Sequence, residues 1–205
     1  MTPTPVHGIA PRPPEEQPGG RTPAPGQLAV VQAFVNTNDI EGGDEQLTDS
    51  DALATWLVDT GLCAPGTRAT HAEFRMALDV REGLRALGEA NGGEPLDPVR
   101  IRALNQAAEK IPLVARLAPE GWHLDGYTAG VSGGLATILS AVVEAMSDDE
   151  WSRMKACKRD RCRWLFYDFS RNRSSVWCAM EICGNKEKAV AYRRRQRARS
   201  RPSPR

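Results

Sequence analysis

Four cysteines near the carboxyl end of the chain have the residue type and the spacing of a metal site. Four residues separate Cys157 from Cys162, fifteen residues follow, and the four-residue gap is then repeated between Cys178 and Cys183. Tetrahedral zinc takes thiolate ligands at about 2.3 Å, and two short loops that each present a pair of cysteines can supply four of them. The spacing therefore predicts a structural zinc ion with Cys157, Cys162, Cys178 and Cys183 as its ligands.

Other chemistry for the same sulfurs stays open at this stage. Two disulfides, an iron–sulfur cluster, or a redox switch that releases zinc on oxidation would all use these cysteines. A catalytic zinc ion would keep an open position and would usually recruit histidine, but His7, His71 and His123 all lie outside this segment. The sequence also has no glycine-rich phosphate loop, nucleophile elbow or HExxH helix. We therefore expect no enzymatic activity.

Positive charges accompany the cysteines. The turn between the two pairs carries Arg171 and Arg173 beside hydroxyl and amide groups, a composition that can hold phosphate. After the last cysteine, KEKAVAYRRRQRARS has the composition of a helix, with Ala189 and Tyr192 expected near the metal and cations over the remaining surface. Cationic helices commonly contact nucleic-acid grooves and backbones. The residues that we expect to contact nucleic acid are Arg171, Arg173, Lys186, Lys188, Arg193, Arg194, Arg195 and Arg197.

The formal net charge of +1 conceals a division along the 205 residues. Residues 1–150 contain 10 Lys and Arg against 22 Asp and Glu, whereas residues 151–205 contain 17 against 4, so the two parts carry −12 and +13. A merely solvated helix face accounts poorly for such a separation. It favours nucleic acid as the partner of the basic part, without distinguishing DNA from RNA. The alternative is a protein-interaction adaptor in which the basic part binds an acidic partner or the acidic part of its own chain.

Most of the elements that position these groups are predicted to be helices. The apolar segment that starts at Leu28 suits a buried helix or a strand equally well. A turn composition separates residues 111–117 from 122–127 and predicts a short hairpin. Capping signals and apolar spacing predict four further helices, starting after Thr48-Asp49-Ser50, at Thr70-x-x-Glu73 and at Asp97-Pro98, and covering residues 134–146.

The basic part is predicted to be a small module. Residues 148–156 have the capping signal of a lead-in helix, and the aromatic residues 163–169 favour a strand. The expected fold class is therefore a mainly α N-terminal domain with a short β-hairpin, plus a small C-terminal zinc-binding module with two Cys knuckles, short strands and one basic helix.

Composition divides the chain into four segments. Residues 1–27 contain 8 Pro and 4 Gly and are expected to form a disordered tail. The mainly helical domain is expected over residues 28–147, the zinc module with its lead-in helix over 148–196, and a basic disordered tail over 197–205. No membrane span or signal peptide is apparent, so we expect a cytoplasmic protein without a membrane partner.

A polar cluster follows the first apolar segment. Asn36, Thr37 and Asp39 could bind a small-molecule effector, although a turn that ends a helix is the commoner explanation of such a cluster. The acidic domain could also form a homodimer.

The segment from Trp151 to Arg195 resembles a known zinc finger. Its pattern, W-x5-C-x4-C-x-W-x-F-Y-D-x-S-R-N-x-S-x2-W-C-x-M-x2-C-G-N-K-x-K-x3-Y-R-x-R, is similar to the CGNR-type zinc finger at the carboxyl end of bacterial proteins. Lys186 stands where the motif has arginine, which keeps the charge but loses the planar fork of donors. The strings Phe34-Val35-Asn36-Thr37 and Leu53-x2-Trp56-Leu57 resemble the ABATE domain that is usually fused before this finger.

The resemblance covers about residues 28–196 and implies a stress-induced transcriptional regulator. It implies the same four cysteines as zinc ligands and a mostly helical N-terminal domain. Together with the charge division, it leads us to expect a zinc-dependent regulator that binds DNA and has an acidic helical domain for sensing or dimerisation.

Overall fold

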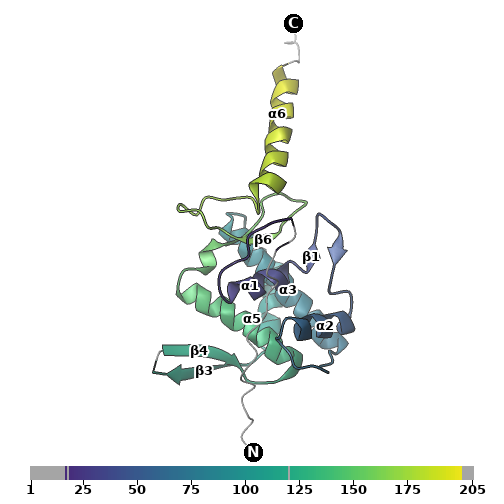
Figure 1. Ribbon diagram of the computed structural model, residues 1–205, viewed down its shortest axis with the longest axis vertical. Helices are drawn as coiled ribbons and strands as arrows, with labels where there is room; N and C mark the ends of the chain where they lie inside the picture. Colours follow the sequence, from purple (N-terminus) through teal and green to yellow (C-terminus); the bar gives the residue numbers. More distant parts are fainter. Residues whose placement is uncertain (1–16, 18, 120, 200–205) are drawn as a thin grey trace, which may run out of the picture.

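The computed structural model describes residues 17, 19–119 and 121–199 (Figure 1). In this part of the chain the helices are α1 Leu28–Val35, α2 Ser50–Asp59, α3 His71–Asn91, α4 Pro98–Ala108, α5 Gly130–Ser147 and α6 Asn185–Arg199. Three antiparallel hairpins pair β1 Asn38–Asp39 with β2 Asp44–Glu45, β3 Leu113–Ala118 with β4 Gly121–Gly126, and β5 Met154–Ala156 with β6 Leu165–Tyr167. Two short turns complete the order, the 3₁₀ turn η1 Trp151–Arg153 and the π-helical turn η2 Met180–Gly184. We call α1–α5 with the first two hairpins the body, and residues 151–199 the zinc module.

The helices of the body begin where their caps predict. Asp49 accepts a hydrogen bond from the Ala52 backbone at the start of α2, and Asp97 with Pro98 opens α4. Both hydrogen bonds of the capping box form between Thr70 and Glu73 at the start of α3. The predicted hairpin is confirmed as β3–β4. The ambiguous apolar segment is α1, and all eight of its residues are buried, which explains why it lacks an alternating pattern.

The core of the body is organised around α5. Leu135 and Ile138 are completely buried, and the helix packs against α1, α2, α3 and the β3–β4 hairpin. In length and composition α5 would also suit a membrane span, but 56% of it is buried inside the protein. Its apolar character is therefore that of a core helix.

The β5–β6 hairpin lies against α3 and joins the zinc module to the body. A Cβ atom at Gly88 of α3 would collide with the Leu165 side chain, so the glycine allows the strand to approach closely. Leu165 and Met154 belong to the core of the body, whereas Trp164 and Phe166 belong to a second core with the cysteines. The strand is apolar on both alternating faces because it separates two cores.

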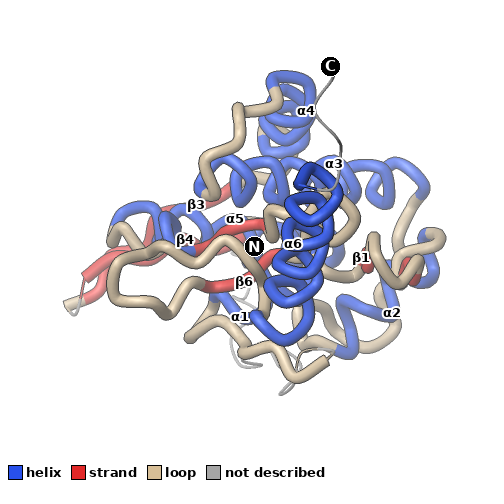
Figure 2. The backbone as a smooth tube through the Cα atoms, turned by 90° about the horizontal axis from the view of Figure 1, so that it is seen from above, coloured by secondary structure: helices blue, strands red, loops and turns tan. Residues whose placement is uncertain are grey.

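One helix stands apart from the rest of the molecule. Figure 1 shows α6 projecting from the body, and in Figure 2, seen from above, it stands over the middle of the fold. The expectation that Ala189 and Tyr192 lie near the metal is wrong, because both are exposed and Tyr192 is 58% exposed. α6 contacts the rest of the zinc module at η2, which it follows directly.

The predicted lead-in helix over residues 148–156 is also absent from this described segment. Asp149 has a φ of 60°, which interrupts a right-handed helix. Trp151–Arg153 form only a 3₁₀ turn, and Met154–Ala156 pair with β6 instead. Tertiary pairing with β6 therefore overrides the local capping signal.

The two expected tails lie partly outside the described residues. Residues 1–16, 18 and 200–205 are not described, so the expectation of disorder there concerns undescribed residues. Within the described part, Gln17 and Arg21 form an isolated bridge, and the Ala24 backbone donates to Gln32 at 2.6 Å. The end of the predicted N-terminal tail is thus packed, because Gln32 of α1 supplies a buried polar partner for it. At the other end, α6 extends to Arg199.

Candidate metal centre and nucleic-acid interface

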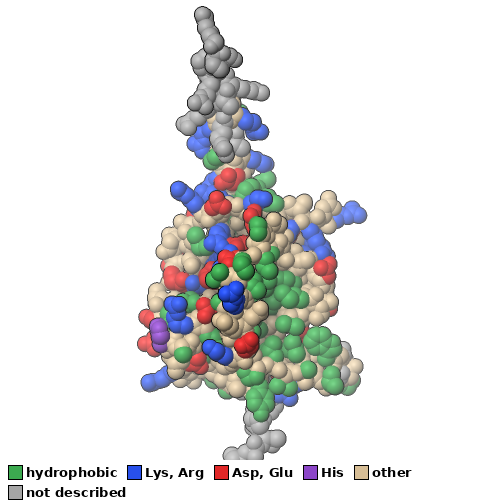
Figure 3. Space-filling model, turned by 180° about the vertical axis from the view of Figure 1, so that it is seen from behind, with side chains coloured by type: hydrophobic (Ala, Val, Ile, Leu, Met, Phe, Trp, Pro, Cys, Tyr) green, Lys and Arg blue, Asp and Glu red, His purple; other side chains and the backbone are tan. Residues whose placement is uncertain are grey.

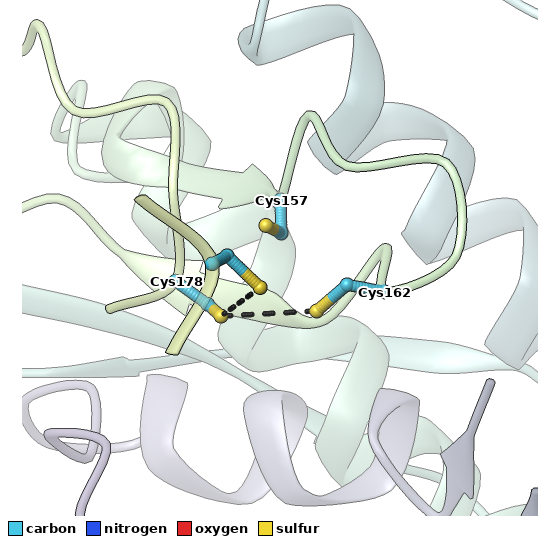
Figure 4. Close-up of side chains that lie close together, drawn as sticks. Cys157, Cys162 and Cys178 are labelled. Atoms are coloured by element: carbon cyan, nitrogen blue, oxygen red, sulfur yellow. Dashed lines mark hydrogen bonds between the residues drawn. The ribbon is translucent and has the colours of Figure 1, made fainter. Parts of the chain in front are cut away.

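The four predicted cysteines converge. Their sulfur atoms all lie within 4.8 Å of one another, and Figure 4 shows three labelled sulfurs directed toward a common space. The Cys178 sulfur is 3.7 Å from the sulfurs of both Cys162 and Cys183. A tetrahedron with metal–sulfur distances of about 2.3 Å has edges of about 3.8 Å. The sulfur set therefore fits one tetrahedral zinc ion.

Two local structures present the sulfurs in pairs. The β5–β6 hairpin carries the first pair: Cys157 donates its backbone N–H to the Trp164 carbonyl at 2.9 Å, and a tight turn brings Cys162 back beside it. The second pair lies in the loop after β6 and in η2, where the Cys183 N–H donates to Ala179 at 3.0 Å. The glycine after Cys183 is needed for space, because a Cβ at Gly184 would collide with the Met180 sulfur. These are the two predicted Cys knuckles.

The surroundings of the sulfurs favour a closed structural site. Cys157, Cys162 and Cys183 are buried, and only Cys178 is partly exposed. Hydrogen bonds from Cys157 and Cys162, together with the Arg21 guanidinium, lower the pKa of the Cys178 thiol, whereas burial raises the pKa of Cys183. Four thiolates complete the shell of a zinc ion without an open position. The cluster is a structural zinc site, and its zinc adds to the small core that the cysteines share with Trp164 and Phe166.

Arg21 is a part of this site that the sequence interpretation missed. Its Nε donates to the Cys178 sulfur at 3.4 Å, and its guanidinium carbon lies 4.4 Å from the centroid of the Trp164 ring. The residue is separated from Cys178 by 157 positions and lies in a Pro- and Gly-rich segment. Nothing local in the sequence signals such a contact.

A buried ion pair fixes the turn between the cysteine pairs. Asp168 accepts hydrogen bonds from Lys155 Nζ at 2.8 Å and from the backbones of Ser170 and Ser175, both at 2.9 Å. Lys155 also donates to the Arg173 carbonyl. Burial tends to raise the pKa of Asp168, but these hydrogen bonds hold it well below its ordinary value. The carboxylate therefore stays charged and organises residues 168–175.

The predicted nucleic-acid residues fall into different environments. Arg173 donates to Asp149 and Ser152, both at 2.6 Å, and Lys186 donates to Glu41 at 2.8 Å. Figure 3 shows Lys and Arg side chains gathered around α6 where it leaves the body. The side chains of Arg194 and Arg197 lie outside the described residues. The exposed members of the set without a described carboxylate partner are Arg171, Lys188, Arg193 and Arg195.

Several cations of the zinc module contact carboxylates of the body. Glu41 pairs with Arg159 as well as Lys186, and these two cations hold the pKa of its carboxyl below the ordinary value. Glu89 of α3 pairs with Arg163, and Lys158 lies 3.6 Å from Glu94. Ion pairs between the acidic body and the basic zinc module thus hold the two regions together. Side chains of the body also donate to carbonyls of the module. Arg85 donates to the Arg163 carbonyl at 2.9 Å, and Asn91 donates to the Trp151 and Met154 carbonyls at 2.7 and 2.9 Å.

The candidate effector residues contribute to the same junction. Asn36 donates to the Leu165 carbonyl and accepts from the Leu165 N–H, both at 2.8 Å, and its side chain is buried. Thr37 is buried too, where it donates to Phe34 and accepts from Arg81. Asp39 accepts backbone hydrogen bonds inside the β1–β2 turn. These contacts account for all three side chains within the fold, and an effector role stays a prediction.

Comparison with protein families assigns both regions. The ABATE family model, described as "Putative stress-induced transcription regulator", matches residues 28–149. The CGNR zinc finger model matches residues 153–196. A search of curated proteins found no match. The first matched range covers the body, and the second covers most of the zinc module, including all four clustered cysteines.

Proposed function

Because the chain belongs to the ABATE family and carries a CGNR zinc finger, we propose that it is a transcription regulator that binds duplex DNA through α6. The family is a regulatory one, and the proposal assigns no catalytic step to the protein. The zinc site serves to hold α6 in a fixed direction relative to the body.

The observation that carries the proposal is the exposure of the α6 cations. Lys188, Arg193 and Arg195 are exposed, and no carboxylate of the described residues lies within ion-pair distance of them. A helix of 15 residues is about 22 Å long and about 10–12 Å wide with its side chains, which suits the major groove of B-DNA, about 12 Å wide. The cations are therefore available to phosphates on either side of a groove.

The connection between α6 and the cysteines supports this role. Cys183 lies two residues before the first residue of α6, so the zinc ligand and the helix share one short backbone segment. The sulfurs in turn are tied to β5–β6, which packs on α3. A helix anchored in this way meets DNA without first losing orientational freedom. We further propose a cytoplasmic location, where thiols stay reduced and can ligate metal.

A binding experiment with matched charge variants tests the proposal. The zinc-loaded protein is titrated with a fluorescently labelled DNA duplex at low and moderate salt. We expect Lys188→Gln/Arg193→Gln/Arg195→Gln to lose more than about tenfold in affinity, because each lost phosphate contact removes counterion release. The control Arg75→Gln/Arg102→Gln/Lys110→Gln removes the same charge from exposed positions of the body and should bind like the unchanged protein.

Two results would overturn the proposal. Absence of duplex binding even at low salt would favour the adaptor alternative, in which the basic module contacts an acidic protein. Equal losses in the two triple variants would show that only net charge matters and that α6 is not the binding element. An RNA duplex of the same sequence serves as the competitor, and tighter RNA binding would replace DNA as the target.

A further inference from the structure

Arg21 connects the N-terminal segment to the only zinc ligand that is not fully buried. The other three cysteines are enclosed by the module, whereas Cys178 is partly exposed. Arg21 Nε donates to the Cys178 sulfur at 3.4 Å, and the arginine is itself only 9% exposed. Arg21 lies outside both matched family ranges, which begin at residues 28 and 153. Its contact with the metal centre is therefore a feature of this chain that the family models do not describe.

The geometry of the N-terminal segment holds Arg21 in this position. Gly19 and Gly20 have φ values of 74° and 70°, and the turn that they form pairs Gln17 with Arg21. Such φ values favour glycine. On the other side, the Ala24 N–H donates to the side chain of Gln32 at 2.6 Å. The segment is thus fixed at both ends of the arginine.

Trp164 completes the environment of the guanidinium. The guanidinium carbon lies 4.4 Å from the ring centroid, and the ring belongs to the same small core as the cysteines. A planar guanidinium can stack on an aromatic ring while an N–H at its edge donates to a neighbouring acceptor. Arg21 therefore makes two interactions that a lysine could not make together with the same geometry.

The charge of a four-thiolate zinc site explains how the contact between Arg21 and Cys178 can stabilise the metal centre. Four thiolates around a divalent cation leave a net charge of about −2, and a hydrogen bond from a cation stabilises the sulfur that receives it. Outer-shell partners of this kind change metal affinity by about 10- to 100-fold. Cys178 is also the sulfur that solvent, a chelator or an electrophile reaches first, because the other three are buried.

We propose that Arg21 is a positioning residue that retains the zinc ion and shields the Cys178 sulfur. Residues 19–24 act as a strap that presents the arginine. This role is independent of DNA binding, because it concerns the stability and the reactivity of the metal centre alone.

Zinc release from the full-length, zinc-loaded protein tests the proposal first. With a coloured chelator in excess, Arg21→Gln should release zinc about 10- to 100-fold faster than the unchanged protein. Arg21→Lys keeps the charge without the planar fork and should fall between them. The control Arg161→Gln removes a charge between Cys157 and Cys162 from an exposed side chain and should leave the release rate unchanged. Equal rates in Arg21→Gln and the unchanged protein would overturn the proposal.

Alkylation mapped by mass spectrometry separates shielding from general loosening. Iodoacetamide reacts when a thiolate sulfur attacks its carbon, forming a thioether and expelling iodide. In Arg21→Gln, labelling of Cys178 should increase before that of Cys157, Cys162 and Cys183. A parallel increase at all four sulfurs would mean that the substitution merely loosens the module, and this result would overturn the specific role of Arg21. Arg21→Lys provides the same comparison if Arg21→Gln folds poorly.

Discussion

The cations of the zinc module that face the body and those that project from it have different partners. Toward the body, each of several cations contacts a carboxylate, in the pairs Arg159–Glu41, Lys186–Glu41, Arg163–Glu89 and Lys158–Glu94. Along α6, Lys188, Arg193 and Arg195 have no such partner among the described residues. The comparison shows that part of the positive charge of the zinc module is used in ion pairs that join the module to the acidic body. Fewer cations are therefore left to contact a nucleic acid than the net charge of +13 for residues 151–205 indicates.

Removal of a zinc ligand should have the largest effect on this arrangement. We expect Cys183→Ser to lose bound zinc, the anchoring of α6 and duplex binding, because metal binding contributes on the order of 10 kcal/mol to the folding of such modules. The body should lose thermal stability as well, since Met154 and Leu165 of the zinc module belong to its core. Elemental analysis and circular dichroism measure these changes.

The fifth cysteine supplies the control for this substitution. Cys63 lies outside the cluster, where its thiol contacts the Gly130 carbonyl, so Cys63→Ser should retain zinc. Full zinc content in Cys183→Ser would contradict the four-sulfur site. An unchanged body in that variant would show that the two regions fold separately.

The next largest effect is expected at the buried ion pair that shapes the turn. Asp168→Ala leaves Lys155 buried without its carboxylate, and breaking such a pair costs about 3–5 kcal/mol of unfolding free energy. Urea unfolding measures the loss. The double variant Lys155→Met/Asp168→Ala, which removes both charges, should recover part of it. If the single and the double variant lost the same unfolding free energy, the unpaired buried charge of Lys155 would not be the cause of the loss.

Asn36→Ala tests the polar junction between the body and β6. The substitution leaves the buried N–H of Leu165 without its partner, while the Leu165 carbonyl keeps a hydrogen bond from the Gln32 amide at 3.3 Å. One unsatisfied buried group costs about 1–3 kcal/mol. Thermal unfolding should report this loss in the protein alone. Asn105→Ala, at an exposed position of α4, should change stability by less than about 0.5 kcal/mol. Unchanged stability of the Asn36→Ala variant would contradict this structural role and would favour the predicted effector role of Asn36.

The smallest effect is expected at Glu41, which pairs with two of the cations that face the body, Arg159 and Lys186. Glu41→Gln weakens two partly exposed ion pairs, so the stability should fall by less than about 1 kcal/mol. Because the pKa of Glu41 is lowered, the pairs stabilise the fold at neutral pH and are lost as the pH falls below 4.5 through the depressed value. In the Glu41→Gln variant Lys186 becomes available to phosphate, so the affinity for a DNA duplex should rise a few-fold. A fall in affinity would instead show that Glu41 positions α6 for binding.

Local signals predicted the features that depend on local chemistry. The caps of α2, α3 and α4 and the four cysteines are read from residues close together in the chain. The contact of Arg21 with Cys178 could not be predicted, because 157 positions separate the partners. The capping signal after residue 147 misled the interpretation, because pairing between β5 and β6 decides the structure there. The roles of Lys186 and Asn36 likewise depend on partners more than a hundred residues away.

The salt dependence of duplex binding tests the central claim most directly. The claim is that the projecting cations of α6, and not those paired with the body, contact DNA phosphates. The logarithm of the binding constant falls with the logarithm of salt concentration by about 0.9 for each phosphate contact. The slope should therefore become shallower by about 2–3 in Lys188→Gln/Arg193→Gln/Arg195→Gln and stay unchanged in Lys186→Gln. An unaltered slope in the triple variant would contradict the account.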